Sequence, residues 1–129
     1  METELVRVDV EGAAGYLLAQ DVEELEDSEP ATGVRLLPAF DQYVLGPGTS
    51  DSRLIPAGRR REVSKAAGWI SPVVLAAGRV AGVWTVADQV LRVSLFAEGR
   101  QVSRAELEQE AARLSRYLGR ELAVTVETT

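Results

Sequence analysis

Alternating apolar and polar residues near the start of the chain predict a β-hairpin. Leu5, Val6, Val8 and Val10 come before Glu11-Gly12, and an apolar run follows at Tyr16-Leu17-Leu18. This pattern is typical of two strands around a glycine-containing turn, either the wing of a larger fold or a simple edge pair. The next segment predicts a short helical turn over 21–25 with Asp21 as its N-cap, followed by an acidic loop that contains proline.

The middle of the chain predicts short strands and one helix. Val34 to Leu37 reads as a strand, which Pro38 must end or leave at a sheet edge. Pro56 suits the first turn of a helix that continues to about Ala67, where a glycine can stop it. Three further apolar runs, separated by turn residues, predict an antiparallel meander over 73–75, 80–86 and 90–96. Along the last of these, apolar and polar residues alternate, so one side of the sheet should face water.

The strongest helix signal runs from Ser103 to about Leu118. Ser103 and Glu106 form a capping box pattern, and Gly119 stands where a left-handed C-terminal cap belongs. The apolar stripe consists of Leu107, Ala111, Leu114 and Leu118. A final strand follows over 122–126. The predicted fold class is α+β, a mostly antiparallel sheet that could curl toward a barrel, with the C-terminal amphipathic helix packed on it. Since no linker or repeat divides residues 1–129, we expect a single domain.

The composition limits the kinds of core and of functional site that the chain can form. The 129 residues are 46% hydrophobic but only 5% aromatic, which indicates an aliphatic core in one domain. Proline and glycine interrupt every apolar run well before the roughly 18 residues that a membrane span needs, so we expect no membrane partner and a cytoplasmic location. The sequence has no cysteine and no histidine. It therefore lacks thiolates and the commonest general base and zinc ligand, and we expect no metal and no cofactor.

Charge is distributed unevenly within the net value of −6. Residues 1–52 carry −10, with twelve acidic and two basic side chains; residues 53–104 carry +6, with nine basic and three acidic; residues 105–129 carry −2. The candidates for contact with a DNA backbone are Arg53, Arg59, Arg60, Arg61 and Lys65. On the predicted helix Arg61 and Lys65 share one face and can reach phosphates together. The alternative is an ordinary solvated helix face. Trp69, just beyond, could stack beside these cations, although a tryptophan before a strand is more typical of the core.

Asp41 is the carboxylate with the most unusual surroundings, because it stands in the aromatic run Phe40-Asp41-Gln42-Tyr43. A functional role would need a paired group with a different proton affinity. The favoured interpretation is that Asp41 turns or caps the chain after Pro38 and accepts backbone hydrogen bonds. The glycine-containing loop over 46–51 lacks the Gly-Lys-Ser/Thr end of a phosphate-binding loop, so we interpret it as an ordinary loop.

Three signatures carry a resemblance to a known family. They are Leu-Leu-Pro-Ala-Phe-Asp-Gln-Tyr-Val-Leu-Gly over 36–46, Gly-Trp-Ile-Ser-Pro-Val-Val-Leu over 68–75 and Gly-Arg-Val-Ala-Gly-Val-Trp over 78–84. With the hairpin before them and the helix after them, they resemble the C-terminal part of the winged-helix DNA-binding family that includes the AlkZ and YcaQ type DNA glycosylases. Enzymes of that type release alkylated or crosslinked bases.

The resemblance implies partners and a limit on catalysis. Tandem winged-helix units precede this region in the family, form most of its DNA channel, and contain the catalytic Gln-x-Gln or Gln-x-Asp motif. None of the five glutamines here has Gln or Asp two residues downstream. The leading hypothesis is a non-catalytic C-terminal module that packs on upstream winged helices and binds double-stranded DNA weakly when alone. A second is a protein-interaction domain, such as a homodimer through a sheet edge; a third is an autonomous hydrolase that uses Asp41.

Overall fold

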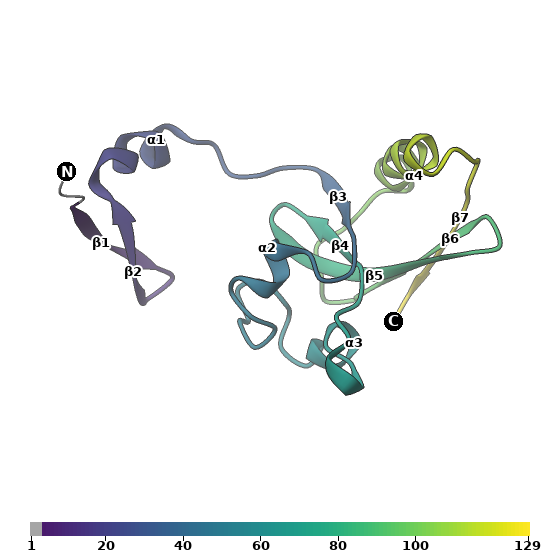
Figure 1. The fold of residues 1–129 in the computed structure, drawn as a ribbon, viewed down its shortest axis with the longest axis horizontal. Helices are drawn as coiled ribbons and strands as arrows, with labels where there is room; N and C mark the ends of the chain where they lie inside the picture. Colours follow the sequence, from purple (N-terminus) through teal and green to yellow (C-terminus); the bar gives the residue numbers. More distant parts are fainter. Residues whose placement is uncertain (1–3) are drawn as a thin grey trace. The chain divides into compact units, whose positions relative to one another are not determined.

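The computed structural model describes residues 4–129. They form two compact units, which divide between Pro30 and Ala31. Figure 1 shows the ribbon of both. We describe each unit by itself, and the prediction of a single domain stays a prediction. No helix among the described residues is long and apolar enough to cross a membrane.

The first unit contains the predicted hairpin. Strands β1 (Leu5–Val10) and β2 (Ala13–Leu18) pair antiparallel, in register from Leu5 opposite Leu18 to Val10 opposite Ala13. Glu11 and Gly12 both have positive φ, as a two-residue turn of this hand requires. A 3-10 turn and helix α1 (Val22–Asp27) follow. Asp21 occupies the predicted N-cap position, but its side chain makes no capping bond.

The second unit is built on a five-stranded sheet in the order β3-β4-β5-β6-β7. Its strands are β3 (Val34–Leu37), β4 (Val73–Ala76), β5 (Arg79–Ala87), β6 (Val90–Leu95) and β7 (Ala123–Thr128). The first three pairs are antiparallel and β6–β7 is parallel, because helix α4 (Arg104–Leu118) supplies the crossover between them. The predicted α+β class and meander are confirmed, but the sheet as a whole is mixed.

The sheet does not close into a barrel. Closure would need β3 to pair with β7, whereas these are the two edges of the sheet. At the β3 edge the backbone N–H of Leu36 donates instead to the carboxylate of Glu110 on α4, at 3.1 Å. The helix thus takes up a donor that a closing strand would have used, and the barrel expectation is wrong.

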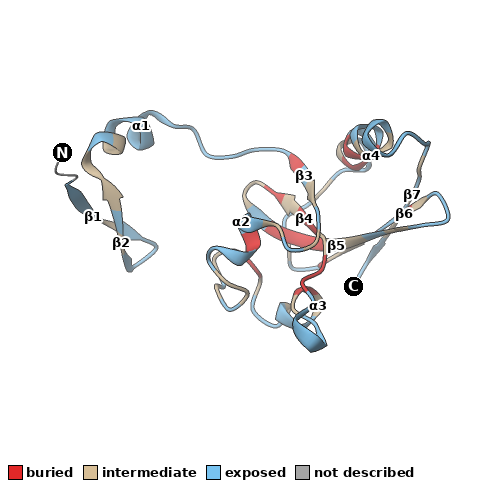
Figure 2. Cartoon of the chain, in the orientation of Figure 1, coloured by how far each residue is buried: buried red, intermediate tan, exposed pale blue. Residues whose placement is uncertain are grey.

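Each face of the sheet has its own core cluster, and Figure 2 shows the buried positions along its central strands. The cluster that includes the helix consists of Val34, Val74, Ala76, Ala81, Leu91, Val93, Leu107 and Ala111. The cluster that includes the irregular segment before β4 consists of Val44, Leu54, Ile55, Val63, Ile70, Val73, Val80 and Phe96. Helix α4 has the predicted capping box, and Gly119 ends it with φ of 72°. On β6 Arg92 is exposed between buried Leu91 and Val93, as the alternation predicted for that strand. The expectation that one side of the whole sheet faces water is wrong, because the segment before β4 covers part of the second face.

The segment between β3 and β4 differs from the prediction. It contains only helix α2 (Gln42–Leu45), helix α3 (Arg60–Val63) and a 3-10 turn over Ala66–Gly68. The continuous helix predicted from Pro56 to Ala67 is wrong for two local reasons. Gly58 has φ of 91°, which delays the helix start, and Ser64 leaves the helix to form a β-bridge with Ile70. Consequently Arg61 and Lys65 do not share a helical face.

Candidate nucleic-acid interface

The five predicted DNA-contacting residues lie on the irregular segment that covers one face of the sheet. Buried Leu54, Ile55 and Val63 anchor this segment to the core, while the basic side chains lie before, between and after them. The structure divides the five into two groups. Arg53 and Arg59 are held by acidic partners within the chain, whereas Arg60, Arg61 and Lys65 are exposed.

Arg53 forms a two-pronged ion pair with Asp51. Its Nε and Nη2 donate to Oδ1 and Oδ2 of that carboxylate, at 2.9 and 2.8 Å, and its backbone N–H adds a third bond at 2.9 Å. These hydrogen bonds, side-chain first, lower the pKa of Asp51 to about 2. The pair therefore closes the turn between the glycine loop and the first core anchor at Leu54.

Arg59 is the most heavily engaged side chain of the segment, with only 18% of it exposed. Its guanidinium binds both carboxylate oxygens of Glu98, pairs with Glu62 at 3.1 Å, and donates to the backbone carbonyl of Thr129 at 2.7 Å. It also lies 4.8 Å from the ring centre of Phe96. The hydrogen bonds from Arg59 are the main reason that the pKa of Glu98 falls to about 2, and the same bonds raise the pKa of Arg59. This cluster ties together three distant parts of the second unit.

Arg60, Arg61 and Lys65 have a different environment. Arg60 donates to the hydroxyl of Thr49 at 3.0 Å, a neutral partner that leaves its charge in place. Across residues 4–129, no ion pair is recorded for any of the three, and all are exposed. Glu62, the acidic residue among them, is turned toward Arg59. We call the exposed stretch of chain that carries Arg60, Arg61 and Lys65 the basic surface; each of its three cations is accessible to a phosphate.

Two aromatic rings that the sequence places far apart come together beside this segment. Phe40 and Trp69 meet edge to face, with ring centres 5.2 Å apart and planes at 88°. They are 45% and 49% exposed, so Trp69 does not join the core as its position before a strand suggested. Trp84 is half-buried instead, and its indole N–H donates to the carbonyls of Leu37 and Val73, both at 3.0 Å.

Asp41 is the N-cap of α2. Its carboxylate accepts the backbone N–H of Tyr43 at 2.9 Å, which is the turn-forming role that the sequence favoured. Tyr43 in turn donates its hydroxyl to the carbonyl of Gly78 at 2.7 Å, which links α2 to the β4–β5 hairpin. Within residues 4–129, no cluster of three or more His, Cys, Asp or Glu side chains could hold a metal ion.

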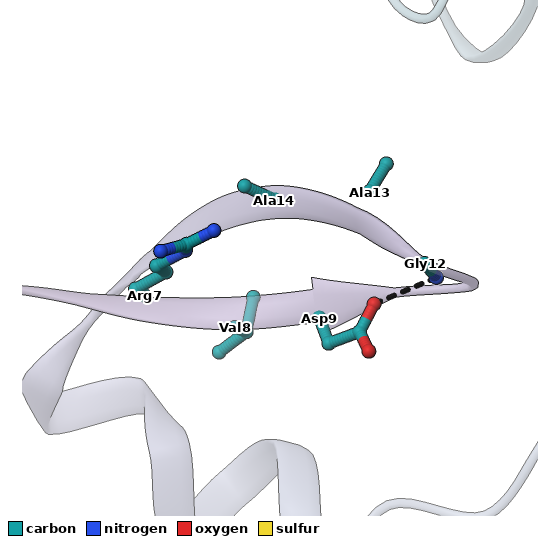
Figure 3. Close-up of a pocket in the computed structure, with 6 residues that line it drawn as sticks. All are labelled: Arg7, Val8, Asp9, Gly12, Ala13 and Ala14. Carbon is teal, nitrogen blue, oxygen red and sulfur yellow. Dashed lines mark hydrogen bonds between the residues drawn. The ribbon is translucent and has the colours of Figure 1, made fainter.

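An open hollow of about 340 Å³ lies on the hairpin of the first unit. It is lined by Arg7, Val8, Asp9, Gly12, Ala13 and Ala14. Figure 3 shows the Asp9 carboxylate turned to the amide of Gly12, at 2.7 Å. Asp9 therefore stabilises the hairpin turn, and we do not interpret the hollow as a binding site.

Comparison with known proteins places this architecture in a family. The family model "DNA glycosylase AlkZ-like" matches residues 1–117. The interstrand DNA cross-link repair glycosylase of Streptomyces sahachiroi is 48% identical over 119 residues, which are 92% of this chain and 32% of that protein. The solved structure of Streptomyces sahachiroi DNA glycosylase AlkZ matches with a TM-score of 0.91 at 46% identity, over 95% of this chain and 33% of that one. The chain thus spans about a third of the length of these relatives. The predicted resemblance is confirmed, and the chain belongs to the AlkZ-like DNA glycosylase family.

Proposed function

We propose that this chain is a non-catalytic, C-terminal module of a DNA-glycosylase-like protein, and that its basic surface contacts the backbone of double-stranded DNA. The observation that carries the proposal is that the basic segment contains two kinds of cation, those in ion pairs within the chain and those that are exposed. Folding engages Arg53 and Arg59 with Asp51 and Glu98, and it leaves Arg60, Arg61 and Lys65 exposed on a well-anchored segment. Exposed cations without an acidic partner are the groups that release counterions from DNA.

A supporting role rather than a catalytic one fits the residues present. The full sequence has no His and no Cys, and it has no Gln-x-Gln or Gln-x-Asp motif. Asp41 already accepts a backbone N–H as a helix cap, and its neighbours in sequence, Phe40 and Gln42, supply no second acid or base to pair with it. We expect the isolated chain to release no base from alkylated DNA. Base release by the purified chain that Asp41→Asn abolishes would replace this proposal with the hydrolase hypothesis.

The first unit supports the part of the proposal that concerns packing on upstream winged helices. None of residues 4–30 is buried, and Leu5, Tyr16 and Leu25 are 63%, 68% and 53% exposed. A two-stranded hairpin with so little burial is marginal in water, so a covering partner would stabilise it. Residues upstream in a longer protein would supply that partner.

The salt dependence of duplex binding tests the DNA proposal. Three phosphate contacts predict that log K falls against log salt with a slope of about −2.7, while all five basic residues would give about −4.5. Fluorescence anisotropy with a labelled duplex measures this slope. Reversing Arg60, Arg61 and Lys65 to Glu should abolish binding. The control reverses Arg100, Arg116 and Arg120, which are exposed elsewhere and change the net charge equally. Equal loss in both triple variants would show that only net charge matters and would end the proposal.

Self-association through a sheet edge is the second candidate. Strand β7 is an edge of the five-stranded sheet, which makes it available for pairing with another chain. One of its carbonyls, that of Val124, already accepts a hydrogen bond from Arg104 at 2.7 Å, which reduces what the edge offers. Sedimentation over a concentration series separates the two functions, because a persistent dimer without DNA affinity favours the second.

A further inference from the structure

The pair formed by Phe40 and Trp69 is held outside the core by backbone that is costly to form. Phe40 has φ of 59° and Ala67 has φ of 61°, in the left-handed region that side chains with a Cβ rarely adopt. Such a conformation is unfavourable at a residue other than glycine, because the Cβ crowds the following carbonyl oxygen. The chain adopts this conformation at both positions, and both rings remain about half exposed. The same conformation also occurs in the hairpin turns at Ala77 and Asp88, so it is its combination with two half-exposed rings that points to a contact beyond the fold.

The turn that carries Trp69 is well fixed at its base. The backbone N–H of Lys65 donates to the carbonyl of Trp69 at 2.8 Å, and the neighbouring Ser64 and Ile70 form a β-bridge. Val63 and Ile70, on the two sides of the turn, are buried in the core cluster. On the other side of the ring contact, Phe40 precedes Asp41, whose cap bond to Tyr43 fixes the start of α2. The two rings are therefore presented by a preorganised support.

The charges around the rings indicate the chemistry of the partner. Lys65 lies on the same turn as Trp69, and Arg61 lies on the short helix that leads into it; both are exposed. The carboxylate next to Phe40, that of Asp41, accepts the N–H of Tyr43, and Glu62, the carboxylate nearest to Trp69 in sequence, is paired with Arg59. Aromatic faces beside cations are the arrangement with which proteins bind unpaired nucleotides, because every base has a face that can stack and a phosphate that attracts the cation.

We propose that Trp69, supported by Phe40, is a stacking site for an unpaired nucleobase, with Arg61 and Lys65 at the adjoining phosphates. The inference rests on the proposed DNA contact and adds to it a preference among DNA forms. The chain should bind a duplex that contains one bulged, unpaired adenine more tightly than the same duplex without it. One stacked base predicts a preference of about five- to 140-fold.

The test compares these two duplexes with the 129-residue chain and with Trp69→Leu, which keeps apolar bulk against Phe40 but removes the stacking face. Trp69→Leu should abolish the preference and leave the affinity for the fully paired duplex unchanged. Tyr117→Leu is the matched control, because Tyr117 is 87% exposed on α4 and away from this turn in sequence. Binding of the bulged duplex should also quench tryptophan fluorescence in the unmodified chain and not in Trp69→Leu, in which only Trp84 remains.

The outcomes separate this inference from the function on which it rests. Binding to both duplexes with equal affinity, or a preference that survives Trp69→Leu, would overturn the stacking site and leave the DNA contact intact. Binding to neither would overturn both. Concentration-dependent self-association that Trp69→Leu removes, with no change in DNA preference, would make the ring pair a protein contact and would also overturn the inference.

Discussion

Removal of the Glu110 carboxylate should loosen the attachment of α4 to the edge of the sheet. Glu110 is 7% exposed and accepts the backbone N–H of Leu36 at 3.1 Å, and its other oxygen pairs with Arg113 at 3.2 Å and with Arg35 at 3.5 Å. Glu110→Ala removes all three contacts at once. Because Leu36 lies on edge strand β3, its N–H has no neighbouring strand on that side to take over the bond.

The magnitude follows from the separate contacts. The two arginines are 62% and 55% exposed, so each ion pair contributes little, between about 0 and 1 kcal/mol. The bond between a backbone N–H and a buried carboxylate contributes about 1.5–3 kcal/mol. We therefore expect Glu110→Ala to lower the free energy of unfolding by roughly 1.5–5 kcal/mol. Glu110→Gln keeps an acceptor oxygen for Leu36 and should lose about half as much.

Urea unfolding followed by tryptophan fluorescence measures these differences, since Trp84 donates to carbonyls of β3 and β4 and reports on that edge. Glu108→Ala is the matched control. It lies on the same helix, is 58% exposed, and pairs only with exposed Arg104 among its recorded contacts, so it should change stability by under about 0.5 kcal/mol. If Glu110→Ala and Glu108→Ala destabilise the chain equally, the carboxylate does not hold the helix to the sheet and this reasoning is refuted.

Three further changes have definite expected results. A Cβ at Gly82 would lie 2.3 Å from the Ser94 carbonyl oxygen and 3.0 Å from the Leu95 Cα. Gly82→Ala should therefore destabilise the chain by about 1–3 kcal/mol, as measured by urea unfolding. Gly33→Ala is the comparison, because a Cβ there meets backbone strain but no neighbouring atom within 4 Å. The pKa of Glu98 is lowered from 4.5 to about 2, so its contribution is fully present above pH 4.5 and is lost as pH falls toward 2; Glu98→Gln should flatten that part of a pH–stability curve, and an unchanged slope would contradict the ion pair with Arg59. Tyr43→Phe removes the bond to the Gly78 carbonyl, and because that bond is exposed we expect a loss of about 0.5–1.5 kcal/mol, with a larger loss pointing to a packing role.

Local signals in the sequence were sufficient for several elements. The helix over 104–118 carries its own start and stop, because Ser103 and Glu106 cap each other and Gly119 takes the left-handed conformation. The hairpins are likewise encoded by short turns and alternating residues, and they appear where the sequence predicted them. In each case the determining contacts join residues only a few positions apart. Their identity therefore follows from spacing alone.

The structural features that the sequence did not predict depend on contacts between distant residues. Proline, basic residues and a terminal glycine made 56–67 resemble a helix, but the bridge between Ser64 and Ile70 and the core contacts of the segment override this propensity. Glu110 lies three residues after Leu107 and so falls on the apolar stripe of the helix. A charged residue at such a position indicates a buried side chain that needs a hydrogen-bond partner. Its partner, the Leu36 N–H, could not be read from the sequence, because it depends on which strand becomes the sheet edge.

The difference between near and distant contacts also explains why the sequence alone does not show which residues of a basic cluster are available to a partner, whereas the structure does. Arg59 and Arg60 are neighbours in the chain, yet Arg59 pairs with Glu98 from the loop after β6, while Arg60 points to a neutral hydroxyl. A partner 39 positions away converts one cation into a fold contact and leaves the next one available. Hence the charge that is available to a polyanionic partner is smaller than the charge in the segment. If the basic surface binds a duplex as proposed, the measured salt slope should correspond to the residues that lack acidic partners, not to the length of the basic run.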